Sequence, residues 1–201
     1  MFSFFLKGGP MMWPILFTSL VTVTVVIERF LFLFRQRRFR REDLVEKIIS
    51  EVEKGNVDEA IRSGEECRDP VVTTLVYGLR HRNKALSNAL LQAANKELKR
   101  FSWGLPVLDT VITLAPLLGL LGTVTGMIHA FGLLGSKELE APTAITGGIA
   151  QALIATACGL GVAIIALIPF NYLNARLEEA RHDIEDAITN VEILLKSDTT
   201  I

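Results

Sequence analysis

The chain has 201 residues, of which 50% are hydrophobic and 21% are charged, and its formal net charge is −1. A mean hydropathy of +0.38 is too high for an ordinary water-soluble domain, and the balanced charge gives no basic face for nucleic acid. The charged residues gather between Arg35 and Arg100 and between Arg176 and Asp198. This segregation predicts membrane spans joined to water-exposed segments.

The first apolar run is "MMWPILFTSLVTVTVVI", residues 11–27, which continues past Glu28 and Arg29 into "FLFLF". A cleaved signal peptide carries its positive charges before the apolar run. Here Lys7 alone precedes the run, whereas arginines follow it at positions 29, 35, 37, 38, 40 and 41. We therefore predict an external N-terminal segment over residues 1–10 and an uncleaved transmembrane helix over residues 11–34.

Residues 35–104 form the only long water-exposed part of the chain. In "DLVEKIISEVEKG" the apolar residues fall on one helical face, at Leu44, Val45, Ile48, Ile49 and Val52. Gly55-Asn56 marks a helix end, and Pro70 suits the start of another helix. Strand alternation and a phosphate-binding loop are both absent from the sequence. We expect a cytoplasmic helical region without a catalytic domain.

Two further apolar runs cover residues 101–136 and 141–173. About 33 helical residues extend over roughly 50 Å, whereas the hydrocarbon core of a membrane is about 30 Å thick. We therefore predict a second transmembrane helix with a cytoplasmic extension over residues 105–135 and a third over 145–173. Residues 136–144 become an external loop. Residues 174–201 repeat apolar side chains at helical spacing, which predicts a cytoplasmic amphipathic C-terminal helix.

The orientation follows from the basic residues that flank the spans. One side carries the arginines after the first span, Lys96, Lys99 and Arg100 before the second, and Arg176 and Arg181 after the third. The other side carries only Lys7 and Lys137. Because basic residues stay in the cytoplasm, we predict that the N-terminus lies outside and the C-terminus inside.

Small residues recur along the second and third spans at helical spacing. Such residues allow helix backbones to approach closely in lipid, so the prediction for this set is helix packing: Gly119, Gly122, Gly126 and Gly159. Pro116 cannot donate a hydrogen bond to Ile112, which predicts a kink beside Gly119.

Polar side chains in the spans allow two interpretations. A membrane threonine usually bonds a carbonyl of its own helix, and Thr123 and Thr156 would then serve only the local structure. Alternatively both hydroxyls line a lumen shared by several subunits. Gln151 is a neutral side chain in the third span, suited to an interhelical hydrogen bond or to a polar lumen. Proton relays in membranes usually need a titratable group, and the central parts of these spans have no carboxylate. A lumen of this kind would need a partner's acid.

The sequence offers little for an enzyme or a metal site. It has no Ser/His/Asp set, no zinc-ligand spacing and no nucleotide loop. The two cysteines, Cys67 and Cys158, lie in segments of opposite character and show no ligand spacing. We therefore predict a protein that is not an enzyme and that has no cofactor and no metal.

Three long stretches carry a resemblance to a known family. "FFLKGGPMMWPILFTSLVTVTVVIERF", "LAPLLGLLGTVTGMIHAF" and "GGIAQALIATACGLGVAIIALIPFNYL" resemble, in this order, the spans of the MotA/TolQ/ExbB proton-channel family. Three spans favour the ExbB/TolQ branch, because the MotA branch has four. The resemblance covers nearly the whole chain.

The resemblance implies an all-α subunit of a homopentamer in the inner membrane of a Gram-negative-type envelope. Two copies of a single-span ExbD/TolR-type partner would insert into the lumen, and the partner's aspartate would carry the proton. Proton flow would drive outer-envelope work, such as TonB-dependent import, through a TonB/TolA-type protein. The family's lumen threonines map onto Thr123 and Thr156 of this chain. Gln151 stands where the family often has glutamate.

Two other functional classes compete with this interpretation. A structural membrane scaffold without ion conduction would use the same small-residue stripes without a wet lumen. A solute carrier is disfavoured, because three dissimilar spans do not supply the inverted repeats expected of one.

Overall fold

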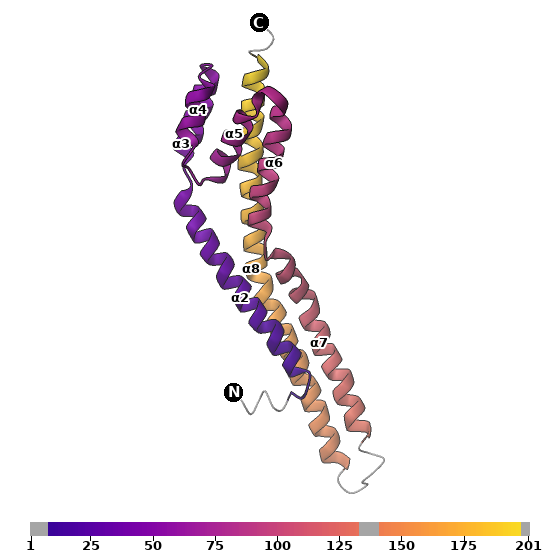
Figure 1. The fold of residues 1–201 in the computed structure, drawn as a ribbon. Helices are drawn as coiled ribbons and strands as arrows, with labels where there is room; N and C mark the ends of the chain where they lie inside the picture. Colours follow the sequence, from indigo (N-terminus) through magenta and orange to yellow (C-terminus); the bar gives the residue numbers. More distant parts are fainter. Residues whose placement is uncertain (1–7, 133–140, 198–201) are drawn as a thin grey trace. The chain divides into compact units, whose positions relative to one another are not determined.

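A computed structural model describes residues 8–132 and 141–197 of the chain. Within these ranges the protein is all-α, with no strand, in agreement with the predicted fold class (Figure 1). The helices are α2 (Met12–Phe39), α3 (Glu42–Glu53), α4 (Val57–Gly64), α5 (Pro70–Arg80), α6 (Arg82–Ser102), α7 (Leu105–Gly132) and α8 (Ala141–Ser197).

Three helical segments are long and apolar enough to cross a membrane: Met12–Phe39, Ala85–Gly132 and Thr146–Leu195. This finding confirms the three predicted spans. The orientation, with the N-terminus outside, stays a prediction. Residues 1–7 of the predicted N-terminal segment lie outside the described residues, as do residues 136–140 of the external loop predicted over 136–144.

The long helices run further than the residues assigned to the spans. α2 continues to Phe39, and α8 is one helix of 57 residues with Pro169 inside it. The third span and the C-terminal amphipathic helix therefore belong to one continuous helix. α7 likewise contains Pro116 within its 28 residues. The kink expected at Pro116 stays a prediction.

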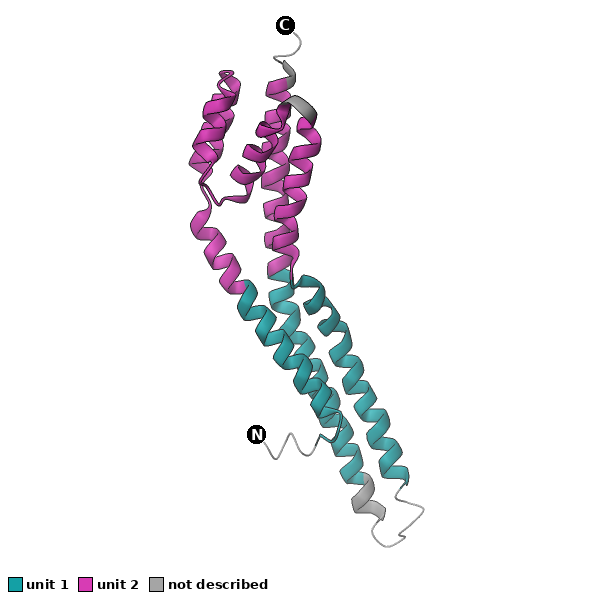
Figure 2. Ribbon diagram, viewed as in Figure 1, with its two compact units in different colours: residues 1–29, 104–172 teal, residues 30–103, 173–201 magenta. Residues whose placement is uncertain are grey.

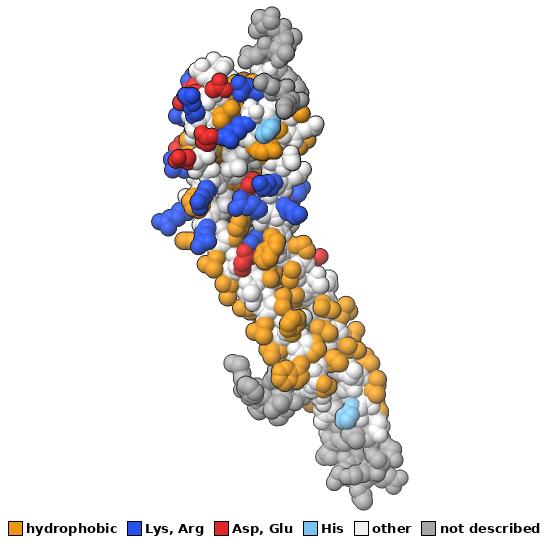
Figure 3. Space-filling model, in the orientation of Figure 1, with side chains coloured by type: hydrophobic (Ala, Val, Ile, Leu, Met, Phe, Trp, Pro, Cys, Tyr) orange, Lys and Arg blue, Asp and Glu red, His pale blue; other side chains and the backbone are white. Residues whose placement is uncertain are grey.

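The chain divides into two compact units (Figure 2). The first, which we call the apolar unit, comprises residues 1–29 and 104–172; the second, the charged unit, comprises residues 30–103 and 173–201. Figure 3 shows hydrophobic side chains over the visible face of the apolar unit and most Lys, Arg, Asp and Glu side chains over the charged unit. The segregation of charge that the sequence shows thus follows the division of the fold.

The charged unit has a core of large aliphatic side chains. Ile48 of α3, Leu75 of α5, Leu90 of α6 and Ile184 of α8 all have no exposed surface and belong to one cluster. Asp69 begins α5, because its Oδ1 accepts hydrogen bonds from the N–H groups of Val71 (2.8 Å) and Val72 (3.4 Å). Ala60 of α4 belongs to the same cluster, so five of the unit's helices are held by one apolar core.

The apolar unit contains the first part of α2, all of α7 and α8 as far as Tyr172. α7 and α8 lie side by side and antiparallel (Figure 1). Most of its buried positions on α7 and α8 are alanine or glycine, whereas large side chains such as Leu117, Ile128 and Ile168 are at least 60% exposed. A helix pair that exposes large apolar side chains and buries small ones suits a lipid environment.

Candidate functional site

α7 and α8 approach one another closely in the apolar unit. A Cβ placed on Gly159 would lie 2.4 Å from the carbonyl oxygen of Ala115, and a Cβ on Gly119 would lie 2.9 Å from the Cα of Thr156. In both cases the obstacle is backbone, which cannot move aside without separating the helices. Hydrogen in place of a side chain is therefore required at both positions.

Gly122 and Gly126 continue this contact along α7. A Cβ on Gly122 would lie 2.6 Å from the Cβ of Ala155, and one on Gly126 would lie 3.1 Å from the Cβ of Ala152. Gly119, Gly122 and Gly126 thus form one face of α7. Gly159, Ala155 and Ala152 form the face of α8 that packs against it. That face brings the polar residues of α7 and α8 close to one another.

Thr156 donates a hydrogen bond across this interface. Its Oγ1 lies 2.9 Å from the carbonyl oxygen of Gly119 on α7, and the side chain is half-buried. The bond needs the close approach at Gly119, because any side chain there would meet the α8 backbone. Thr156 therefore links α7 and α8, and its hydroxyl proton points at the neighbouring helix instead of its own.

Thr123 behaves differently. Its Oγ1 donates to the carbonyl oxygen of Leu120, three residues earlier in α7, at 2.6 Å. The half-buried side chain lines a shallow open groove together with Val124, Met127, Ile128, Phe131 and Gly132. The bond is the local one that a membrane threonine usually makes. The structure thus places Thr123 on an open face of α7, and it places Thr156 of α8 in the contact between α7 and α8.

Gln151 lies against the N-terminal turn of the chain. A Cβ on Gly9 would lie 1.7 Å from the Nε2 of Gln151, so the amide occupies the space that a side chain would take. Gly9 also has a φ of +74°, a left-handed backbone that favours glycine. The half-buried Gln151 thus packs on the Gly-Gly-Pro turn that precedes α2. Sequence reasoning did not pair these segments, although the glycine doublet before Pro10 was a usable signal.

Formal charge in the described apolar unit is confined to three residues. Glu28 and Arg29 are adjacent on α2, with Oε1 and Nη2 2.5 Å apart, and Arg29 is 4% exposed. Asp109 is exposed on the first turns of α7. From Thr110 to Gly132 and from Ala141 to Tyr172 the sequence has no Asp, Glu, Lys or Arg. The segments that carry the small-residue interface, Thr123 and Thr156 thus lack a carboxylate of their own.

Comparison with known proteins agrees with this architecture. Residues 64–186 match the model of the MotA/TolQ/ExbB proton channel family. A biopolymer transport protein named ExbB-like 1, from Synechocystis sp., is 38% identical over 84% of this chain and 68% of its own length. The biopolymer transport protein ExbB of Neisseria meningitidis serogroup A is 29% identical over 90% of this chain and 88% of its own. The Tol-Pal system protein TolQ of Haemophilus influenzae is 36% identical over 56% of this chain and 49% of its own.

Proposed function

Because the chain belongs to the MotA/TolQ/ExbB proton channel family, we propose that it is the stator subunit of an ExbB/TolQ-type motor in the inner membrane of a Gram-negative-type envelope. In this proposal the chain forms a homopentamer around a lumen. A single-span ExbD/TolR-type partner occupies the lumen, and a TonB/TolA-type protein receives the work, as in TonB-dependent import. The N-terminus lies outside and the C-terminus in the cytoplasm.

The observation that carries the proposal is that two threonine hydroxyls lie in membrane-spanning segments without charged residues. Thr123 and Thr156 stand in segments without Asp, Glu, Lys or Arg. Each donates its proton to a backbone carbonyl, so the oxygen of each keeps acceptor capacity for an incoming acid or water. A membrane proton path needs a titratable group, which the partner's carboxylate would supply.

The two threonines take different parts in this proposal. Thr123 lines the open groove of α7 and is the better placed to face a helix that enters from outside the subunit. Thr156 holds α7 against α8 through Gly119 and so positions the wall that carries Thr123. Gln151 fastens the N-terminal turn to α8, a role that needs no ionised group.

A flux assay tests the proposal directly. The chain is reconstituted in proteoliposomes with a pH-sensitive dye inside, alone or together with an aspartate-bearing ExbD/TolR-type partner. We expect proton flux with the partner and little without it, because the central parts of the spans have no carboxylate. Equal flux from the chain alone would contradict the borrowed-acid mechanism. Assembly with the partner but no flux under a pH gradient would favour the scaffold without ion conduction.

A double variant tests the role of the hydroxyls. Thr123→Val together with Thr156→Val keeps the side-chain shape, and we expect assembly with the partner but loss of most partner-dependent flux. Thr125→Val is the control, because Thr125 donates to Leu121 and Gly122 of its own helix. Full flux in the double variant would show that both hydroxyls serve packing only.

A further inference from the structure

The charged unit contains a cavity of about 380 Å³. It lies among the end of α2, α3, the start of α5 and the C-terminal part of α8, and Phe101 of α6 also contributes to its wall. This volume falls in the range of small-molecule sites, about 300–1,000 Å³. None of its lining residues belongs to the apolar unit, so the cavity is separate from the threonines of α7 and α8.

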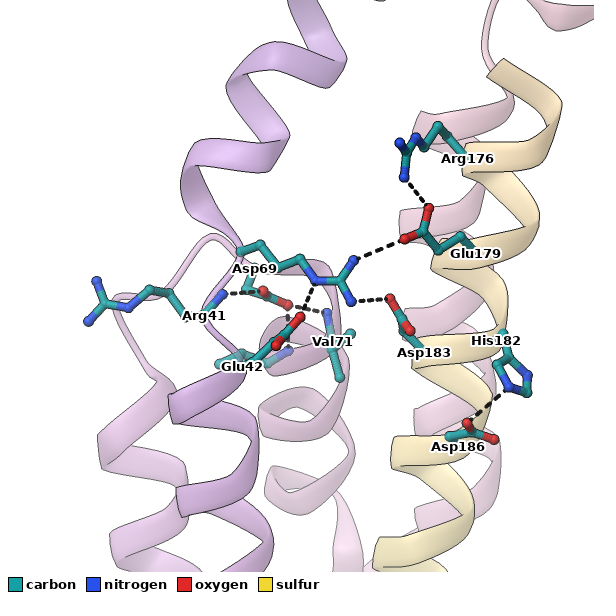
Figure 4. Close-up of polar contacts among 11 residues, drawn as sticks. Arg41, Glu42, Asp69, Val71, Arg176, Glu179, His182, Asp183 and Asp186 are labelled. Atoms are coloured by element: carbon teal, nitrogen blue, oxygen red, sulfur yellow. Dashed lines mark hydrogen bonds and ion pairs between the residues drawn. The ribbon is translucent and has the colours of Figure 1, made fainter. Parts of the chain in front are cut away.

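Two of the cavity's three arginines, Arg40 and Arg176, are already paired with carboxylates. Arg40, between α2 and α3, pairs with Glu42 (2.9 Å), Asp183 (3.0 Å) and Glu179 (3.6 Å). Arg176 pairs with Glu179 at 2.5 Å. Figure 4 shows Glu179 and Asp183 of α8 directed toward the segment that joins α2 to α3. An anionic ligand would have to displace these carboxylates, so Arg40 and Arg176 do not make an anion site.

The carboxylates of the cavity outnumber its arginines. The lining holds three arginines and six acidic residues, which are Glu42, Glu46, Asp69, Glu179, Asp183 and Asp186. Asp69 is 2% exposed and accepts from backbone N–H groups, including that of Arg41 at 2.8 Å. Its charge is therefore satisfied by the fold. The wall as a whole still carries more negative than positive charge.

Two of the remaining carboxylates, Glu46 and Asp186, lie on different helices. Glu46, on α3, makes no hydrogen bond or ion pair with any residue that the structure describes. Among the residues that the structure describes, Asp186 on α8 pairs only with the exposed His182, whose Nε2 lies 3.3 Å from Oδ2 of Asp186. The lining also includes apolar groups from several helices: Leu33, Val45, Ile49, Val71, Phe101 and Ala180. The cavity wall thus combines apolar side chains with two exposed carboxylates on different helices.

We propose that this cavity binds a small linear organic cation, an alkyl diamine whose stem packs on the apolar lining and whose ammonium groups pair with Glu46 and Asp186. Charge complementarity selects the cation, and the apolar lining selects a carbon stem over a hydrated metal ion. Asp183 gives separate support. Burial raises the pKa of this carboxyl, with Glu179 and Glu42 acting in the same direction and Arg40 opposing them. A bound cation would relieve that penalty.

Titration calorimetry on the full-length chain in detergent at pH 7.5 tests the proposal, with 1,5-diaminopentane as the probe. We expect saturable binding that weakens with added salt. The neutral isostere 1,5-pentanediol should bind about tenfold more weakly or worse, since about 1.4 kcal/mol of charge interaction corresponds to tenfold. Equal binding of the diol would overturn the proposal. So would the absence of saturable heat up to about 10 mM diamine, a concentration at which a dissociation constant corresponds to a binding free energy of only ~3 kcal/mol.

Matched variants separate the cavity from general surface charge. Glu46→Gln with Asp186→Asn should weaken diamine binding about fivefold or more, the change expected for partly exposed ion pairs. Glu59→Gln with Glu66→Gln removes the same charge from exposed sites outside the cavity and should change binding less than about twofold. Ala180→Leu adds a larger side chain to the cavity wall without changing charge, and it should abolish diamine binding. Equal weakening by the two charge pairs would assign the binding to the surface. Circular dichroism shows that each variant is folded.

Discussion

The apolar and charged units are built from the same kind of helix but are held together by different contacts. In the charged unit, Leu75, Leu79 and Leu90 have no exposed surface, and their side chains fill the space between helices. In the apolar unit, small residues such as Ala115 and Ala155 are fully buried where α7 and α8 meet, and the two helices approach backbone to backbone. The charged unit thus packs its core with large side chains, whereas the α7–α8 contact of the apolar unit is made mostly of small ones.

The difference follows from the solvent of each unit. Water drives large apolar side chains together, so the charged unit gains stability from the area that it buries. Lipid offers no such driving force between helices, and association there depends on close packing and interhelical hydrogen bonds. The two units should therefore respond in opposite ways to truncating a leucine and to enlarging a glycine.

The largest effect is expected for Leu75→Ala in the charged unit. The change leaves a cavity in a core where Leu75 is fully buried, and it should cost about 2–5 kcal/mol. Hydrogen exchange of the charged unit's amides measures this loss. Leu91→Ala on α6 is the control, because Leu91 is 55% exposed. Equal costs for the two variants would show that this unit does not rely on its core.

Gly159→Ala should have the next largest effect, and it tests the apolar unit. The added methyl would lie 2.4 Å from the Ala115 carbonyl oxygen, so α7 and α8 must separate, at a cost of about 1–3 kcal/mol. Gly161→Ala, two residues further along α8, meets nothing within 4 Å and should be neutral. Thermal unfolding in detergent compares the pair. A harmless Gly159→Ala would rule out the backbone contact.

Thr156→Val should have a smaller effect. It removes the hydrogen bond to Gly119 but keeps the shape, and interhelical bonds in membranes are worth about 0.6–1.7 kcal/mol. Thr156→Ser restores the hydroxyl and should recover most of the stability. Thr123→Val breaks only a bond within α7, so its unfolding temperature should stay close to that of the unchanged chain. A larger loss from Thr123→Val would reverse the roles that we assign to the two threonines.

Much of the fold could be predicted from the sequence, because segregated charge and apolar length depend only on composition along the chain. The three spans and the apolar face of α3 were found in this way. The continuity of α8 was not, because a change from apolar to amphipathic pattern at residue 173 looks like a boundary between helices. A helix can pass from one solvent to another without a break in its backbone.

The candidate site was only partly accessible to sequence reasoning. Helical spacing singled out Gly119, Thr123 and Thr156 as notable. It left open which carbonyl each hydroxyl would bond, since that depends on how closely α7 and α8 approach. The contact of Gln151 with Gly9 joins segments far apart in the chain, and no local periodicity reports such a pairing. The cavity around Arg40 escaped notice for the same reason.

The smallest effect concerns Asp183 and the pH response of the charged unit. Burial raises the pKa of this carboxyl above 3.8, so the folded unit holds the proton more tightly than the unfolded chain does. The free energy of unfolding therefore falls as pH rises from about 3.8 through the higher pKa of the folded state. Asp183→Asn removes this pH dependence. Below pH 3.8 the variant and the unchanged chain should have the same free energy of unfolding. At pH 7 the variant should be more stable by less than ~0.5 kcal/mol, because the carboxyl is partly exposed. Glu185→Gln, an exposed neighbour on α8, controls for the lost charge, and hydrogen exchange at several pH values measures the difference. If Asp183→Asn proves less stable at pH 7, attraction to Arg40 outweighs burial, and ion pairs then contribute to holding the charged unit together alongside its apolar core.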